Sequence, residues 1–279
     1  MVLSSYSKIN LSLTINSKRK NNMHDIQSFF CLIDLKDKIK LSKIKGKKDK
    51  IFFKGPFSKF VNKSNNSIVK LLKFLRKSKL IEDHYSVTIT KNIPVFAGLG
   101  GGTGNAAFIL KHLLKKKLNN NLIGKVQTKI GSDLRLFFYR LGYLKNLDTI
   151  IDLDRKFKLY FLLAQPRVRC STKEIYSKVR KFSKKKVLKK QLIQNKNNFI
   201  NYLSDKCDND LQLIVEKKYP IIKPLLKDIK NQKGCSFSRM TGSGSVCYGL
   251  FKDQITAKKA LYNLKNKYPK FWLSLAKTV

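Results

Sequence analysis

Apolar and polar residues alternate over residues 85–90, where Tyr, Val and Ile take turns with hydroxyl side chains. This period of two predicts a half-buried strand. From Ala106 to Leu118 the apolar residues instead recur at the spacing of a helix. The segment between them, residues 91–105, therefore joins a strand to the start of a helix.

The same two periods divide the rest of the chain into two α/β halves. Further strands are predicted over residues 9–15, 32–41, 50–53, 155–165 and 271–275, and residues 238–248 are predicted to enter one more strand that runs through residue 251. Further helices are predicted over residues 65–75, 121–131, 181–198, 209–215 and 254–268. The second half thus consists of strand–helix–strand units typical of a ferredoxin-like domain. We place the boundary just before residue 155, so the expected domains are residues 1–154 and 155–279.

The first predicted strand carries polar residues on one face. Lys8, Asn10, Ser12 and Thr14 share this face, because successive side chains of a strand point to opposite sides. A polar row on an edge strand is usually solvated. A row that opens with Lys and Asn also suits a surface that faces a charged substrate. The pattern alone leaves both interpretations open and favours the first.

Five of the fourteen glycines stand within seven residues of the linking segment, at positions 98, 100, 101, 102 and 104. Glycine permits positive φ and lets a ligand approach the backbone without meeting a Cβ. The helix that follows offers unpaired first-turn N–H groups and the positive end of its dipole. The segment therefore predicts a cradle for an anion, above all for phosphate.

Two well-known phosphate loops do not account for this run. A Walker A loop continues with Lys-Ser/Thr after its last glycine, and neither residue follows Gly104. A dinucleotide pattern can be read through Gly102, Gly104 and Ala107, but no acidic residue near position 125 could bind a ribose. A glycine-rich surface turn without a ligand stays open as an alternative.

Charge is the most unusual feature of the composition. The 279 residues include 60 Lys and Arg against 17 Asp and Glu, a formal net charge of +43. Such a balance can indicate a nucleic-acid or acidic-membrane partner. Here the lysines are scattered over nearly every segment and far outnumber the arginines. We therefore expect no dedicated nucleic-acid partner, although the positive field would attract substrates that bear phosphate.

The remaining composition predicts a cytoplasmic protein without a membrane partner. Five cysteines stand at no metal-ligand spacing and indicate free thiols in a reducing compartment. No apolar run approaches the ~18 residues of a membrane span. The first twenty residues are acid-poor and rich in Ser and Lys, as in a transit peptide, but a strand motif already begins at Lys8.

Residues 94–107, PVFAGLGGGTGNAA, match the pattern Pro-x-x-x-Gly-Leu-Gly-Gly-Gly-Ser/Thr-x-Asn-Ala-Ala. This pattern resembles the ATP-binding loop of the GHMP kinases, which phosphorylate small-molecule hydroxyls or phosphates. Residues 8–11 are similar to the first motif of that superfamily and residues 238–248 to its third. The resemblance implies an α+β, two-domain GHMP kinase fold: an N-terminal α/β domain with the glycine-rich phosphate loop and a C-terminal ferredoxin-like α/β domain.

Within the superfamily, the triple glycine followed by a hydroxyl residue is similar to the branch that phosphorylates 4-diphosphocytidyl-2-C-methyl-D-erythritol. The resemblance implies transfer of the γ-phosphoryl of ATP, with Mg²⁺, to the 2-hydroxyl of this cytidine diphosphate-linked methylerythritol in the non-mevalonate route to isoprenoid precursors. The sequence leaves a monomer or a homodimer open.

The resemblance also implies ATP-binding residues. Asn66, which by itself would be a helix N-cap, would face the adenine, and Thr103 is a candidate contact to Mg²⁺ or to a phosphate oxygen. The full expected set is Asn66, Lys91, Pro94, Gly98, Leu99, Gly100, Gly101, Gly102, Thr103 and Gly104.

Two residues are implied to be catalytic, Lys8 and Asp133. Asp133 follows a predicted helix that ends at Gly131, at the position of the family's base. Lys8 matches a lysine implicated in phosphoryl transfer. Arg135 stands where proline is usual, so the turn after the acid departs from the pattern. Without the resemblance, Asp133 would be interpreted as a helix or turn cap.

The expected substrate-binding residues are Asn10, His24, Tyr176, Thr241, Gly242 and Ser243. His24 keeps the register of a histidine that contacts the cytosine, and Tyr176 that of an aromatic residue that stacks on it. Asn22 and Met23 replace Gly and Tyr of the family pattern, and Lys173 replaces a proline. One wall of the base pocket therefore differs, although a thioether can still lie against a ring.

Two other functions stay open. One is another GHMP kinase, such as homoserine or phosphomevalonate kinase, against which the pairing of His24 with Tyr176 argues. The other is a non-enzymatic basic protein that binds nucleic acid, which predicts steep salt-dependent binding and no ATP consumption.

Overall fold

The computed structural model describes residues 1–19, 23–153, 157–188 and 190–279, which pack into two compact units. Unit 1 contains residues 1–8, 32–95 and 100–139, and unit 2 contains residues 9–31, 96–99 and 140–279. The domain boundary predicted between residues 154 and 155 lies outside the described residues. Two strands, β1 (Val2–Asn10) and β3 (His24–Ile44), run through both units.

Unit 1 combines residues 2–8 of β1 and three neighbouring strands with three helices. Strand β5 (His84–Thr90) pairs antiparallel with residues 38–44 of β3 and parallel with β4 (Lys50–Lys54). The helices are α1 (Ser67–Lys77), α2 (Gly101–Leu114) and α3 (Asn120–Ile130), and the short 3₁₀ segments are η1 (Ser58–Phe60), η2 (Lys115–Lys117) and η3 (Ser132–Phe138).

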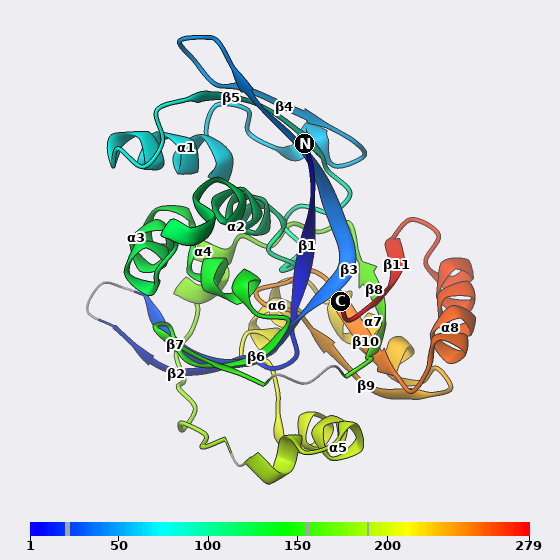
Figure 1. Cartoon of the computed structure of the whole chain (residues 1–279). Helices are drawn as coiled ribbons and strands as arrows, with labels where there is room; N and C mark the ends of the chain where they lie inside the picture. Colours follow the sequence, from blue (N-terminus) through cyan, green and yellow to red (C-terminus); the bar gives the residue numbers. More distant parts are fainter. Residues whose placement is uncertain (20–22, 154–156, 189) are drawn as a thin grey trace. The chain divides into compact units, whose positions relative to one another are not determined.

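The core of unit 1 forms where the apolar stripes of these helices meet the strands. Leu71 and Leu75 of α1, Ile109 of α2 and Val126 of α3 are fully buried in one cluster with Ile89 of β5. Because one face of each helix carries these residues, the three helices share a single layer against the strands, as Figure 1 shows. This layer positions the starts of α1 and α2 and the end of α3.

Unit 2 contains a four-stranded antiparallel sheet with the order β11-β8-β10-β9. Its strands are β8 (Tyr160–Gln165), β9 (Cys235–Met240), β10 (Cys247–Phe251) and β11 (Trp272–Lys277), and helices α7 (Ile222–Lys230) and α8 (Gln254–Lys267) pack on it. This order of strands in a strand–helix–strand repeat is that of a ferredoxin-like domain. The predicted α+β fold class and ferredoxin-like second half are therefore confirmed.

In the sequence, the remaining elements of unit 2 come before the first strand of this sheet or between its first two strands. Strand β2 (Thr14–Lys18) pairs with β3, which also pairs with β6 (Leu141–Asn146), and β6 pairs with β7 (Thr149–Asp152). The helical segments are α4 (Thr172–Ser177), η4 (Lys190–Ile193), α5 (Lys196–Lys206) and α6 (Gln212–Lys218). Among the described residues, no helix is both long enough and apolar enough to cross a bilayer.

The polar row of the first strand is buried. The exposed fractions of Lys8, Asn10, Ser12 and Thr14 are 2%, 3%, 4% and 7%. The alternative of a solvated edge is therefore wrong. The strand predicted over residues 9–15 is also interrupted, since β1 ends at Asn10 and β2 begins at Thr14. Between them, Leu13 N donates to Asp208 O at 2.8 Å instead of to β3.

The helix predicted over residues 181–198 is wrong for its first half. Residues 181–188 have no regular secondary structure, and helix α5 begins only at Lys196. Ser183 N donates to Ile15 O at 2.8 Å, and Gln27 exchanges two hydrogen bonds with the backbone of Lys186, at 2.8 and 2.9 Å. These tertiary hydrogen bonds replace those of the predicted helix, and we name residues 181–188 the irregular segment.

Candidate active site

The glycine loop of unit 1 ends in the first turn of α2. Gly100 is the N-cap of this helix and has a left-handed conformation, with φ of 68°. Gly104 N donates the first intrahelical hydrogen bond to Gly100 O at 2.8 Å. The N–H groups of Gly101, Gly102 and Thr103 therefore lie outside the hydrogen bonding of the helix. They form the donor set that an anion such as phosphate requires.

Two of these glycines are also required by packing. A Cβ on Gly100 would lie 2.8 Å from Phe137 Cζ and 3.2 Å from Lys8 Cε. A Cβ on Gly104 would lie 2.8 Å from Phe137 Cε1. The loop thus rests directly on Phe137 and on the stem of Lys8, which places the proposed catalytic lysine beside the loop.

Lys8 and Asp133 are far apart in sequence but meet within unit 1. Lys8 Nζ lies 3.1 Å from Asp133 Oδ2, with exposed fractions of 2% and 33% for the two side chains. Asp133 is the second residue of η3, and η3 begins directly after Gly131. Gly131 ends α3 and has a φ of 150°. The carboxylate is thus accessible to a ligand, whereas the ammonium is buried behind it.

Arg135, which replaces the usual proline, anchors the turn after the acid. Its Nε donates to Gln127 Oε1 at 2.8 Å and its Nη2 to Asn120 O at 3.1 Å. Both acceptors belong to α3. Hydrogen bonds to a neighbouring helix therefore hold η3 where a proline ring would otherwise restrict the backbone.

The other expected ATP-binding residues of unit 1 lie at the start of α1, beside the loop or in the buried interior of the unit. Asn66 Oδ1 accepts from Ile68 N and Val69 N at 3.0 and 3.1 Å, so its side chain caps α1. A Cβ on Gly102 would lie 3.3 Å from Ser67 Oγ, so the start of α1 is beside the loop. Pro94 is buried, and the ammonium of Lys91 is buried against Asp37.

Thr103 lies beside the turn that leads to Asp133. A Cβ on Gly131 would be 3.4 Å from Thr103 Oγ1. Within the described residues, no group of three His, Cys, Asp or Glu side chains could hold a metal ion. The hydroxyl of Thr103 is a group that could add an oxygen ligand to a magnesium ion beside the loop.

Unit 2 contains the second glycine turn, residues 241–245, and the first residues of the glycine loop. Ser245 N and Val246 N donate to Phe96 O and Ala97 O at 3.1 and 3.2 Å. A Cβ on Gly98, where φ is 73°, would lie only 2.2 Å from Thr241 O. Only glycine permits this approach, and the adjacent Leu99 is buried.

Asn10 belongs to the same group. Its N–H donates to Thr241 Oγ1 at 3.0 Å and its Nδ2 to Ser28 Oγ at 2.8 Å. A Cβ on Gly242, where φ is 55°, would lie 3.3 Å from Asn10 Oδ1. The structure therefore brings three of the expected substrate-binding residues together within unit 2.

Ser243 connects this turn to the aromatic residues. Its hydroxyl is 2.9 Å from that of Thr172, at the start of α4, which carries Tyr176. The ring centroids of Tyr176 and His24 are 5.2 Å apart, with an interplanar angle of 40°. Burial, and to a lesser extent the nearby Lys18, lower the pKa of His24, so the imidazole is neutral at pH 7.

A second aromatic ring beside His24, in addition to that of Tyr176, was not expected from the sequence. Phe182, in the irregular segment, has its ring centroid 6.3 Å from that of His24 and is 49% exposed. Met23 is 37% exposed, while Asn22 lies outside the described residues. The available signal was an aromatic residue, Phe182, within a lysine-rich stretch. Because a solvated helix was predicted there, Phe182 was not assigned to the site.

Asp37 and Asn209 were missed as well. Asn209 Nδ2 donates to Met240 O and Gly242 O, both at 2.8 Å, and so supports the second glycine turn. Asp37 is a fully buried acid in a chain with few acidic residues, and that scarcity of acids was its only signal.

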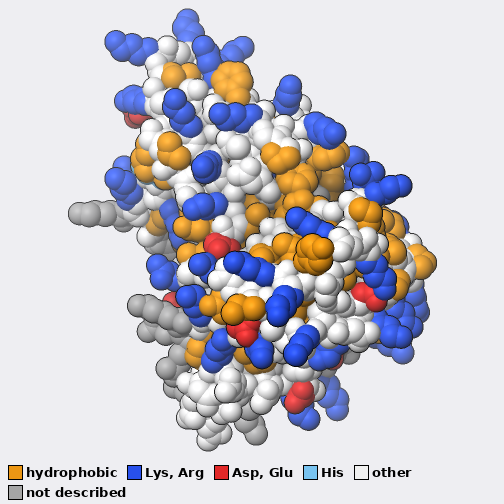
Figure 2. Space-filling model, turned by 90° about the vertical axis from the view of Figure 1, so that its right-hand side faces the viewer, with side chains coloured by type: hydrophobic (Ala, Val, Ile, Leu, Met, Phe, Trp, Pro, Cys, Tyr) orange, Lys and Arg blue, Asp and Glu red, His pale blue; other side chains and the backbone are white. Residues whose placement is uncertain are grey.

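On the face shown in Figure 2, lysine and arginine side chains are spread widely and do not gather in one patch.

Comparisons with known proteins agree with these features. The family model of the GHMP kinase N-terminal domain matches residues 66–134, which include the glycine loop and Asp133. The model of the GHMP kinase C-terminal region matches residues 183–270, which include the second glycine turn.

Similar proteins and structures extend this match over the whole chain. A 4-diphosphocytidyl-2-C-methyl-D-erythritol kinase of Pelagibacter ubique is 37% identical, over 99% of this chain and 98% of its own. One from Caldanaerobacter subterraneus is 30% identical, over 99% and 96%. A crystal structure of 4-(cytidine 5'-diphospho)-2C-methyl-D-erythritol kinase shares the fold, with a TM-score of 0.75, 21% identity and 99% coverage of both chains. A homoserine kinase from Cytophaga hutchinsonii also shares the fold, with a TM-score of 0.67, 15% identity, and coverage of 100% and 94%. The family prediction is therefore confirmed, and the chain belongs to the 4-diphosphocytidyl-2-C-methyl-D-erythritol kinase family of the GHMP kinases.

Proposed function

We propose that this kinase transfers the γ-phosphoryl group of ATP to the 2-hydroxyl of 4-diphosphocytidyl-2-C-methyl-D-erythritol, a step in the synthesis of isoprenoid precursors. The names of the relatives that match along the whole chain support this substrate. The observation that carries the proposal is the contact of Lys8 Nζ with Asp133 Oδ2, 3.1 Å long, beside the glycine loop.

In the proposed reaction, Asp133 accepts the proton of the attacking hydroxyl. A carboxylate one-third exposed can reach a substrate, and a positioned base contributes typically about 10²–10⁴-fold to a rate. Lys8 holds this carboxylate and places a positive charge where negative charge develops. Phosphoryl transfer has a charge-rich transition state, so positioning and electrostatic stabilisation dominate its catalysis.

The N–H groups of Gly101, Gly102 and Thr103 would hold the phosphates of ATP. We propose Asn66, Lys91, Pro94, Gly98, Leu99, Gly100 and Gly104 as the residues that shape the rest of the nucleotide site. Mg²⁺ would be held by the phosphates together with Thr103, since this ion commonly uses few protein oxygens beside a nucleotide. When bound, the ion would neutralise phosphate charge.

The substrate side of the proposal rests on unit 2. Neutral His24 with Tyr176 and Phe182 offers aromatic surface for a cytosine ring, because aromatic side chains stack on nucleobases. Asn10, Thr241, Gly242 and Ser243 would position the remainder of the substrate. We further propose a cytoplasmic enzyme that is a monomer or a homodimer, with domains at residues 1–154 and 155–279.

A coupled assay of ADP release tests the proposal directly. We expect ATP consumption that depends on the cytidyl substrate and does not occur with homoserine or phosphomevalonate. Turnover of either of those alcohols or phosphates in its place would overturn the substrate assignment. Salt-sensitive binding of nucleic acid without any ATP consumption would overturn the kinase assignment itself.

A further inference from the structure

We propose that Asp37 is a positioning residue that ties together the two ends of the glycine loop and so sets the affinity for ATP. The proposal concerns the nucleotide side of the proposed function and rests on it. Asp37 belongs to β3 and was not identified from the sequence.

The carboxylate of Asp37 is completely buried and has four donors. Its Oδ1 accepts from Asn92 N at 2.7 Å and from Ile93 N at 2.9 Å. Its Oδ2 pairs with Lys91 Nζ and accepts from Asn105 Nδ2 at 3.0 Å. A buried charge is costly unless it is paired and hydrogen-bonded, and this one satisfies both conditions.

These donors come from the two sides of the loop. Lys91, Asn92 and Ile93 directly follow β5, whereas Asn105 lies in α2, just after the first-turn N–H groups. All of them belong to unit 1. One carboxylate therefore connects the point where the chain leaves the strand with the point where it enters the helix, and this distance determines where the loop amides lie.

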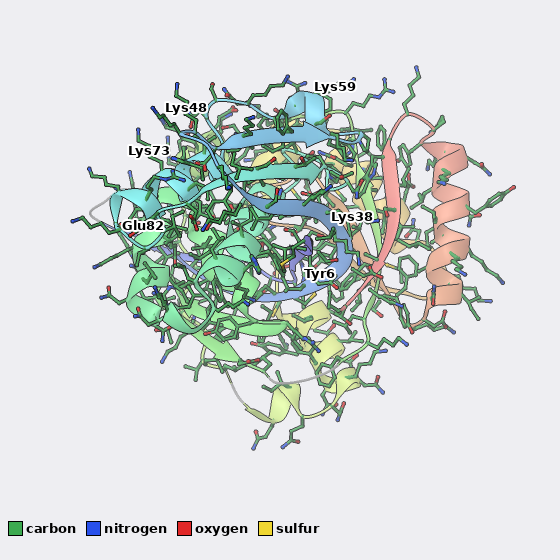
Figure 3. All side chains as sticks on the ribbon, turned by 45° about the horizontal axis from the view of Figure 1, so that its top comes forward. Tyr6, Lys38, Lys48, Lys59, Lys73 and Glu82 are labelled. Atoms are coloured by element: carbon green, nitrogen blue, oxygen red, sulfur yellow. The ribbon has the colours of Figure 1, made fainter. Side chains whose placement is uncertain are left out.

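Lys91 lies directly beneath the loop. A Cβ on Gly101 would be 3.3 Å from Lys91 Nζ. Figure 3 shows Lys48, Lys59 and Lys73 at the periphery, pointing outward, as lysines usually do. Lys91 is instead 3% exposed, and its charge adds to the positive end of the α2 dipole where an anion would bind. Asp37 keeps this buried ammonium in place.

A purely structural ion pair is the competing explanation. Breaking a buried pair by removing one partner is strongly destabilising wherever the pair lies. Such a role predicts a loss of stability with unchanged ATP affinity in the folded molecules. A positioning role predicts that the affinity for ATP also falls, whereas the affinity for the cytidyl substrate stays unchanged.

The chain offers a matched control in Asp49. Its carboxylate also lies in unit 1, pairs with Arg76 at 3.0 and 3.1 Å, and accepts from a backbone N–H, that of Tyr85, at 2.9 Å. Tyr85 is at the opposite end of β5 from Lys91. Asp49→Asn therefore removes the same kind of interaction from the same unit, away from the loop.

The experiment compares Asp37→Asn, Asp49→Asn and wild type by melting temperature, by calorimetry with a non-hydrolysable ATP analogue, and by KM for both substrates. We expect both variants to melt earlier. We expect Asp37→Asn alone to weaken binding of the analogue at least ~10-fold, with KM for the cytidyl substrate within ~2-fold of wild type. Analogue affinity equal to that of wild type in folded Asp37→Asn would overturn the proposal.

A milder variant keeps the test decisive if Asp37→Asn does not fold. Asn105→Ala removes only the donor from α2, and Asn105 Oδ1 has no hydrogen-bond partner to lose among the described residues. We expect this variant to weaken analogue binding ~3–10-fold, and wild-type affinity would count against the proposal.

Measurements of analogue binding and of turnover on the wild-type protein distinguish a failure of this proposal from a failure of the proposed function. Analogue binding without turnover of the cytidyl substrate would overturn the proposed substrate and leave the role of Asp37 to be decided by its variants. No analogue binding by wild type would overturn both.

Discussion

The two glycine-containing turns of this kinase are supported in different ways. The glycine loop of unit 1 rests on buried charges, since Lys8 and Lys91 are 2% and 3% exposed and each pairs with a carboxylate. The second glycine turn of unit 2 is supported by neutral groups, such as the amide of Asn209 on two backbone carbonyls and the backbone N–H of Asn10 on Thr241 Oγ1.

The two kinds of support differ in how strongly they depend on one particular side chain. A buried charge depends steeply on its partner, because removing one member leaves the other unpaired. Contacts between a base and apolar side chains are less demanding in geometry. The substitutions at Asn22, Met23 and Lys173 fall on the aromatic side, where Phe182 adds another ring beside His24. Arg135 is a substitution on the charged side, and its hydrogen bonds to α3 hold the turn after Asp133.

The largest effect is expected from removing the charges beside the loop. Asp133→Asn and Lys8→Met should each lower kcat by about 10²–10⁴-fold, because the base and its charged partner are lost. Binding of the ATP analogue, measured by calorimetry, should stay within a few-fold of wild type. An equal loss of nucleotide affinity in both variants would make the pair structural and would remove its catalytic role.

Gly100→Ala should have the next largest effect. At φ of 68° an alanine costs ~1–2 kcal/mol, and its Cβ would meet Phe137 Cζ at 2.8 Å. We expect a lower melting temperature and analogue binding weakened by about tenfold, a factor that corresponds to about 1.4 kcal/mol. The control is Gly46→Ala, whose Cβ would meet nothing closer than Ile44 Cδ1 at 3.9 Å. Wild-type affinity in Gly100→Ala would show that the loop adjusts freely.

Phe182→Leu tests the neutral side of the comparison. Stacking on a base contributes ~1–3 kcal/mol, and leucine keeps part of the apolar contact, so we expect KM for the cytidyl substrate to rise by about fivefold with KM for ATP unchanged. Phe52→Leu is the control, since Phe52 is 54% exposed on β4 of unit 1.

Restoring an aromatic residue at position 23 should sharpen this result. Met23→Tyr is expected to lower KM for the cytidyl substrate more than KM for ATP, and to recover part of the loss in Phe182→Leu. If neither substitution alters KM for the cytidyl substrate, these positions do not contact the base.

The smallest effect concerns pH. Because burial lowers the pKa of His24 below its ordinary value of 6.5, the unfolded chain binds a proton more readily than the folded protein. The contribution of His24 is therefore complete above the ordinary pKa and is lost as the pH falls below it. Urea unfolding at several pH values should show this loss in wild type and a smaller one in His24→Gln. Identical pH profiles would contradict it.

Local sequence determined much of this protein. The strand of residues 85–90, the glycine run and the helix after it follow from periodicity and from the conformational freedom of glycine, both of which act between near neighbours in the chain. The identities of Lys8 and Asp133 also followed from motifs, through the family resemblance, and the structure brings them within 3.1 Å.

Only the tertiary structure decided which distant groups meet. Asp37 receives donors from residues 91–93 and from Asn105, and no local pattern announces that convergence. Residues 181–188 have the composition of a solvated helix but form no helix, because Ile15, Gln27 and Asp210 hydrogen-bond to Ser183 and Lys186. Such choices depend on partners that packing supplies from far along the chain, whereas local periodicity describes each segment alone.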